Sequence, residues 1–164
     1  MRPRRTPACQ TETVGGSGGD GLDRFVSAQR DTYDRALAEI RAGRKRTHWM
    51  WFVFPQLAGL GHSATAAYYA LSGLAEAAAY LAHPVLGPRL VAISRALLDL
   101  PAPDPTAVFG YPDDLKLHSC MTLFAQVHGA DAVFGAVLAA CFAGRPDDAT
   151  LRLLGGRPPD PALS

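Results

Sequence analysis

Two segments of the chain place polar side chains inside apolar runs, and these residue types could do chemistry. In the first segment, residues 48–63, His48 and Gln56 flank two tryptophans, Trp49 and Trp51, and Ser63 closes the segment. Indole and imidazole rings carry polar groups on flat bodies, so they can stack on a planar ligand and form hydrogen bonds to its edge. The other interpretation is that these aromatic rings belong to the core and that His48 is a buried, hydrogen-bonded histidine.

The second segment, residues 113–122, brings carboxylates, a lysine and hydroxyl groups together. On one helix, Lys116 and Ser119 share a face, while Asp113 and Asp114 occupy the first turn. Acidic residues there interact favourably with the helix dipole, which alone would explain them. The alternative is a carboxylate–lysine–hydroxyl cluster that faces the aromatic segment. Lys116 would then bind an anionic group, and an aspartate would orient a sugar hydroxyl or act as a general base.

These patterns predict one pocket at which His48, Trp51, Asp114 and Lys116 meet. The candidates for catalysis are Asp114, Lys116 and His48. The candidates for ligand binding are Trp49, Trp51, Gln56, Ser63 and Ser119.

Motifs of other kinds of site are absent from the sequence. The five histidines are scattered, and no two of them stand four residues apart, so neither a metal nor a cofactor is predicted. Cys120 and Cys141 lie in amphipathic segments and are expected to be buried as small hydrophobic residues rather than to act as nucleophiles.

Composition excludes several classes of protein. The chain has 164 residues, a net charge of +1 and 48% hydrophobic residues, which is typical of a folded domain rather than a disordered chain. The small net charge argues against nucleic acid as a partner, and no protein partner is indicated. No apolar run reaches the roughly 18 residues of a membrane span, and no secretory signal is recognisable. We therefore expect a soluble cytoplasmic protein.

Breaks in the apolar periodicity divide the chain. Residues 1–20 and 156–164 are rich in Gly or Pro and are expected to be disordered tails, with a folded domain over 21–155. Within it, apolar residues recur with the 3.6-residue period of helices between capping and breaking residues. This pattern predicts an all-α, compact single domain of seven or eight helices. Residues 48–57 are compatible with a strand or, by a small margin, with a short helix capped by Thr47.

The first predicted helix runs from an N-cap at Asp20 to a stop at Gly43. Most of its charged residues, including Glu39, lie off the apolar stripe and are expected to form a solvated face. The basic run that follows, Arg44-Lys45-Arg46, is expected to be a solvated helix terminus whose cations suit the helix dipole. A nucleic-acid contact is the less favoured interpretation of that run.

The segment His48-Trp49-Met50-Trp51-Phe52-Val53-Phe54-Pro55-Gln56-Leu57 resembles the signature of a bacterial family of unknown function, number 1810. The resemblance covers about residues 22–155 and includes Asp114-Leu115-Lys116-Leu117 and the segment from Tyr80 to Leu90. It implies a multihelical fold and no established activity. Members often carry the label calpastatin, although calpain inhibitors are disordered and polar whereas this chain is apolar.

Two functions from different classes fit these patterns. In the first, the domain binds or hydrolyses a small planar ligand such as a nucleotide or a nucleotide-sugar. In the alternative, it is a non-catalytic protein–protein interaction module whose aromatic residues are core. The sequence does not decide whether the protein is an enzyme.

Overall fold

The structure, a computed structural model, describes residues 17–155. The regular secondary structure in this range is helical, apart from one isolated bridge between Leu57 and Leu71. The all-α prediction is confirmed, but the described residues form ten helices rather than seven or eight. They are α1 (Ser17–Gln29), α2 (Tyr33–Arg41), α3 (Met50–Val53), α4 (Ala64–Tyr69), α5 (Leu74–Ala82), α6 (Leu86–Leu98), α7 (Pro105–Phe109), α8 (Asp113–Ala125), α9 (Val133–Phe142) and α10 (Asp148–Leu153). The predicted tails lie outside the described residues except for 17–20, which belong to α1.

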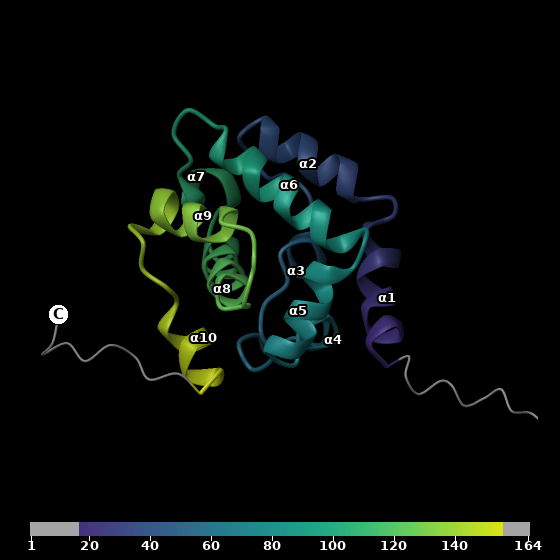
Figure 1. The fold of residues 1–164 in the computed structure, drawn as a ribbon. Helices are drawn as coiled ribbons and strands as arrows, with labels where there is room; N and C mark the ends of the chain where they lie inside the picture. Colours follow the sequence, from purple (N-terminus) through teal and green to yellow (C-terminus); the bar gives the residue numbers. More distant parts are fainter. Residues whose placement is uncertain (1–16, 156–164) are drawn as a thin grey trace, which may run out of the picture.

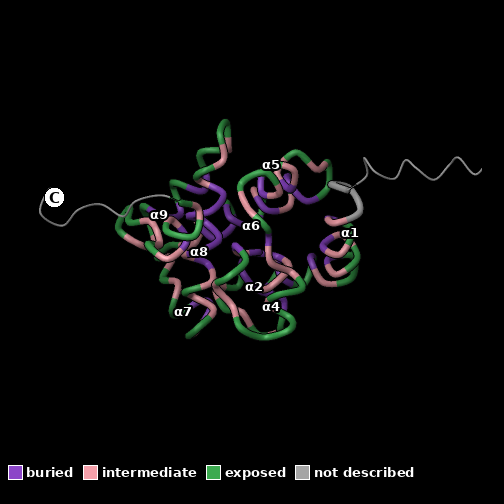
Figure 2. The backbone as a smooth tube through the Cα atoms, turned by 90° about the horizontal axis from the view of Figure 1, so that it is seen from below, coloured by how far each residue is buried: buried purple, intermediate pink, exposed green. Residues whose placement is uncertain are grey.

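Helix α8 lies beside α7 and α9 in Figure 1. It packs against α5, α7, α9 and α10, and its buried residues include a continuous run from Ser119 to Phe124, so every side of the helix is covered there. Helix α6 packs against α2, α5 and α9. In Figure 2, buried backbone gathers along α6 and α8, and exposed backbone lies at the periphery.

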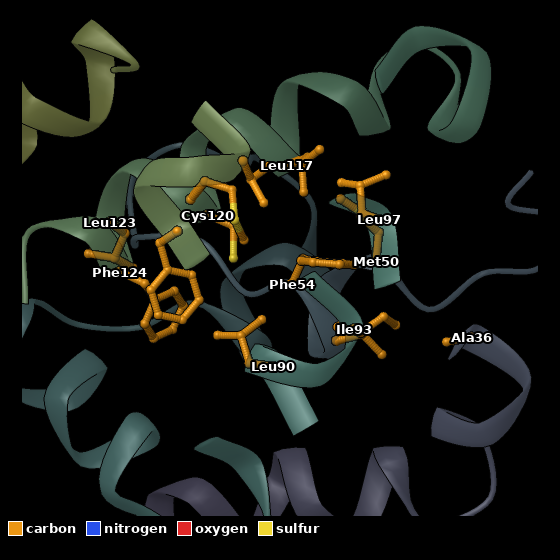
Figure 3. Close-up of a cluster of buried hydrophobic side chains, with 14 of the residues drawn as sticks. Ala36, Met50, Phe54, Leu90, Ile93, Leu97, Leu117, Cys120, Leu123 and Phe124 are labelled. Carbon is orange, nitrogen blue, oxygen red and sulfur yellow. The ribbon is translucent and has the colours of Figure 1, made fainter. Parts of the chain in front are cut away.

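The core is formed by side chains from α6, α8 and the aromatic segment. Leu90, Ile93 and Leu97 of α6 lie in one cluster with Met50 and Phe54 (Figure 3). Helix α8 adds Leu117, Cys120, Leu123 and Phe124. Because all of these residues are almost completely buried, this cluster is the main apolar contribution to folding.

The single helix predicted between Asp20 and Gly43 is wrong, because the chain turns after Gln29 and starts again at Tyr33. The two halves have different partners: α1 packs against α3 and α5, and α2 packs against α6. At the break, the buried Gln29 amide donates to the Phe52 carbonyl (2.7 Å) and to the Tyr80 hydroxyl (3.0 Å). The three-residue turn keeps the apolar spacing, so periodicity alone did not reveal it.

The aromatic segment contains a short helix, α3, and continues as an irregular chain from Phe54. The helical interpretation is therefore correct, but Thr47 is not its cap. The N-cap position is Trp49, without a side-chain cap, and the Thr47 hydroxyl donates to Glu39 instead (2.7 Å).

Serine and aspartate before apolar runs predict side-chain caps at Ser63, Ser72, Asp104, Asp113 and at Asp147 or Asp148. Those at Ser63, Asp104 and Asp147 are confirmed, whereas the N-cap positions of α5 and α8 are Gly73 and Pro112, without a side-chain cap. Ser63 accepts a hydrogen bond from Ala66 N–H at α4, Asp104 accepts two at α7, and Asp147 accepts one from Thr150 N–H at α10. These caps determine where short helices begin after proline- or glycine-rich connections.

Replacing Asp104 with alanine is expected to destabilise the protein by about 1 kcal/mol, because the N–H groups of Thr106 and Ala107 lose their acceptor. Asp104→Asn, which keeps an acceptor oxygen, is the matched control and should lose less. Urea unfolding of the three proteins measures this difference. Equal stability of Asp104→Ala and the unmodified chain would contradict the capping role.

No helix within residues 17–155 combines the length and the apolar character needed to cross a bilayer.

Candidate functional site

A cavity of about 300 Å³ lies where the irregular chain after α3 meets the starts of α8 and α10. Its polar lining comes from Gln56, Lys116, Ser119 and Asp147. Its apolar lining comes from Leu60, Gly61, Pro112, Leu115 and Ala149. The cavity therefore combines residues from both segments that sequence reasoning selected, 48–63 and 113–122.

Lys116 connects this cavity to the aromatic segment. Its ammonium group lies 4.8 Å from the centre of the Trp51 ring and 3.1 Å from Asp113 Oδ1. The indole face and the carboxylate both attract the cation, so they hold the lysine in one position. The ammonium therefore occupies one face of the Trp51 ring.

Lys45 binds the same carboxylate from the other side. Its Nζ lies 2.9 Å from Asp113 Oδ2 and 5.1 Å from the centre of the Trp49 ring. The side chain is only 7% exposed, so the expectation that this lysine belongs to a solvated helix terminus is wrong. Its neighbours Arg44 and Arg46 are exposed as expected. The chain contains two lysines and two tryptophans, and each lysine lies over one of the tryptophans.

Asp147 adds a second carboxylate to the cavity. Its Oδ2 accepts hydrogen bonds from Thr150 N–H (3.0 Å) and Thr150 Oγ1 (2.6 Å), and Ser119 Oγ lies 3.3 Å away. Its own N–H donates to Thr122 Oγ1 (2.8 Å), which ties the start of α10 to the buried side of α8. The sequence identified Asp147 only as a cap, because nothing in the local pattern shows that α10 folds back onto α8.

Four of the predicted site residues lie elsewhere. Trp49 is fully buried and its indole N–H donates to Glu39 Oε1 (2.8 Å), so a ligand does not reach it in this structure. Asp114 accepts a hydrogen bond from the Thr106 hydroxyl (2.9 Å), and Ser63 caps α4. His48 is exposed, and none of these four lines the cavity. Of the residues predicted to meet, the structure brings Trp51 and Lys116 together, with Gln56 and Ser119 beside Lys116.

Glu39 is the buried group that organises the chain before the aromatic segment. It accepts hydrogen bonds from the N–H groups of Arg46 and Thr47, from the Thr47 hydroxyl and from the Trp49 indole. Burial by itself raises the pKa of Glu39, but these hydrogen bonds outweigh it and lower the pKa from 4.5 to about 2. The prediction of a solvated face is wrong at this position, since Glu39 is 8% exposed.

Neither of the two cysteines within residues 17–155 is an activated nucleophile. Cys120 is fully buried, which raises the pKa of its thiol well above the usual value. Burial also raises the pKa of Cys141 to about 11. Both thiols are therefore protonated at neutral pH. Over residues 17–155, no three His, Cys, Asp or Glu side chains lie close enough together to hold a metal ion.

A larger cavity, of about 680 Å³, lies between α5, α6 and the connection from α8 to α9. Its lining is mostly small and apolar, with Ala78, Ala82 and Val91 on the two helices, and it contains none of the predicted site residues. An exposed ion pair between Arg95 and Asp131 (3.3 Å) lies at this cavity.

Comparison with known proteins identifies relatives but no activity. No protein with a curated function matches the chain. The crystal structure of the conserved hypothetical protein Rv1873 from Mycobacterium tuberculosis is similar, with 49% sequence identity and a TM-score of 0.80. The similarity covers 83% of this chain and 97% of the mycobacterial chain. The model of a family described as "Protein of unknown function (DUF1810)" matches residues 19–154. The chain therefore belongs to the DUF1810 family of proteins of unknown function.

Proposed function

We propose that the cavity at Lys116 binds a small polar ligand that carries both an anionic group and hydroxyl groups, in the class of sugar phosphates and nucleotide-sugars. The observation that carries the proposal is that Lys116 and Asp147 line the same cavity. A lysine ammonium binds phosphate or carboxylate oxygens, and a carboxylate accepts hydrogen bonds from sugar hydroxyls. Gln56 supplies both a donor and an acceptor.

The size of the cavity determines which part of such a ligand fits. A volume of about 300 Å³ is at the lower end of the range for small-molecule sites. It suits a sugar with its phosphate, and the base of a nucleotide-sugar would remain outside, beside the exposed Leu115.

Binding is favoured over hydrolysis by the positions of the candidate catalytic residues. A general base must lie within hydrogen-bonding reach of the proton that it abstracts. Asp114 is bound to Thr106, and His48 does not line the cavity. The carboxylate in the cavity, Asp147, caps a helix and is engaged with Thr150.

The test is a titration with ADP-ribose, UDP-glucose, ribose 5-phosphate and ribose. A ligand at 100 times its Kd should stabilise the protein by about 2.7 kcal/mol, and the melting temperature should rise accordingly. Binding at Lys116 should also change the fluorescence of Trp51, because the ammonium over its ring would move or change partner.

Lys116→Met is expected to abolish this stabilisation and leave the helical circular-dichroism spectrum unchanged, since the side chain is 22% exposed and its loss leaves no cavity in the core. Lys116→Arg, which keeps the charge, is the matched control and should retain binding. The proposal is wrong if no member of the panel binds, or if Lys116→Met binds as tightly as the unmodified protein.

The alternative, an interaction module, is favoured by a different observation, the apolar cavity between α5 and α6. A partner bound there would not depend on Lys116. Replacement of Val91 by aspartate would weaken such a partner and leave the titration above unaffected.

A further inference from the structure

We propose that Lys45, which does not line the cavity, makes the cavity selective for anionic ligands by neutralising Asp113. This inference rests on the proposed function, and it names a residue that determines the charge of the ligand. Lys45 Nζ and Lys116 Nζ lie 2.9 Å and 3.1 Å from the two oxygens of the same carboxylate. The three groups together carry two positive charges and one negative charge.

The two lysines differ in what they can reach. Lys45 is 7% exposed and lies over the buried Trp49, so its ammonium cannot contact a ligand in the cavity. Lys116 is 22% exposed and lines the cavity. The net positive charge of the cluster is therefore presented to the cavity by Lys116.

Without Lys45, Asp113 would have Lys116 as its remaining partner in the cluster. The carboxylate would then offset part of the charge of Lys116, and it would repel the anion that the lysine attracts. A half-buried carboxylate is screened only partly by solvent, so this repulsion would act across the cavity.

Two other carboxylates, Asp114 and Asp147, lie near this cluster, and neither changes where an anionic group would bind. Asp114 is bound to Thr106 on α7. Asp147 lines the cavity itself, and its Oδ2 accepts hydrogen bonds at the start of α10. Its charge favours ligand hydroxyls and disfavours a second anionic group, so the anion must lie at Lys116. Lys45 is the group that keeps the charge of Lys116 available there.

The first measurement uses iodide, an anion that quenches tryptophan fluorescence by collision. Trp49 is fully buried and Trp51 is partly exposed, so quenching reports on Trp51, beside Lys116. Lys45→Met should lower the iodide quenching constant about twofold at low, constant ionic strength, because the local potential falls. Quenching by neutral acrylamide should not change. Lys45→Arg, which keeps the charge, should behave as the unmodified protein does.

The second measurement uses ligands that differ in charge. Lys45→Met should weaken the binding of ribose 5-phosphate on the order of tenfold and leave the affinity for ribose unchanged. A purely structural Lys45 would instead affect both ligands, or both quenchers, equally, and that result overturns the inference. An unchanged ratio of iodide to acrylamide quenching overturns it as well.

These outcomes separate the inference from the proposed function. If none of the sugar ligands binds the unmodified protein, the proposed function fails, and the ratio of the two quenching constants still decides the role of Lys45. If ribose 5-phosphate binds and Lys45→Met binds it equally well, the proposed function stands and the inference fails.

Discussion

Replacing Glu39 with alanine is expected to destabilise the protein by about 3–5 kcal/mol, although Glu39 forms no part of the cavity. The carboxylate accepts four hydrogen bonds from residues 46, 47 and 49, and one of the donors is the fully buried indole of Trp49. Alanine would leave these donors without their acceptor. Urea unfolding followed by circular dichroism measures the loss. A change below about 1 kcal/mol would show that water replaces the carboxylate without cost.

Glu39→Gln is the matched control, because it removes the charge and keeps one acceptor oxygen, although the other oxygen is replaced by an NH2 group. The pKa of Glu39 is lowered to about 2 in the folded protein from an ordinary value of 4.5. A lowered pKa stabilises the folded protein above pH 4.5, and this stabilisation is lost as the pH falls toward 2. The difference in stability between the unmodified protein and Glu39→Gln should therefore be largest at neutral pH and shrink in acid. A difference that stays constant between pH 7 and pH 3 would contradict this assignment.

Replacing Gly87 with alanine is expected to cost about 3 kcal/mol or more. A Cβ atom at this position in the first turn of α6 would lie 2.1 Å from the Leu81 carbonyl oxygen, which belongs to the backbone of α5. Backbone cannot move aside as a flexible side chain does, so α6 would have to shift away from α5. Because α6 also packs against α2 and α9, that shift would disturb the core.

Gly135 in α9 provides a control within the same protein. A Cβ atom there would meet nothing within 4 Å, and its backbone is helical. Gly135→Ala should therefore stabilise the protein by about 0.5–1 kcal/mol, since alanine loses less conformational entropy in a helix than glycine does. The two substitutions make the same chemical change and should act in opposite directions in thermal or urea unfolding. Equal effects would mean that the close approach of α5 and α6 is not a constraint.

Local patterns in the sequence were sufficient to predict the helical class and the caps at Ser63, Asp104 and Asp147. A cap acts within a few residues of its own position, and the apolar stripe of a helix repeats every 3.6 residues. The break after Gln29 escaped the same reasoning. The turn preserves the stripe, and the groups that hold Gln29 come from α3 and α5.

The candidate site residues show the same difference between what local sequence reveals and what the fold decides. Lys116, Ser119 and Gln56 could be chosen from the sequence, because polar side chains inside apolar runs need partners or solvent. The partners themselves are distant in the chain: Lys45 is 68 residues before Asp113, and Asp147 is 28 residues after Ser119. The basic and acidic residues 39–46 resemble a solvated surface when only their order along the chain is known.

The sequence by itself therefore determined the helical class, some of the helix caps and the residue types available for binding. Only the tertiary structure decided that Trp49 is core, that Trp51 holds Lys116, and that Lys45 shares Asp113 with Lys116. The physical reason is range: helix formation and capping depend on neighbours within about one turn. Whether a charge can be buried depends on its partners in space. The packing of α3, α8 and the segment before Trp49 decides which distant carboxylate or indole lies within a few ångström of it.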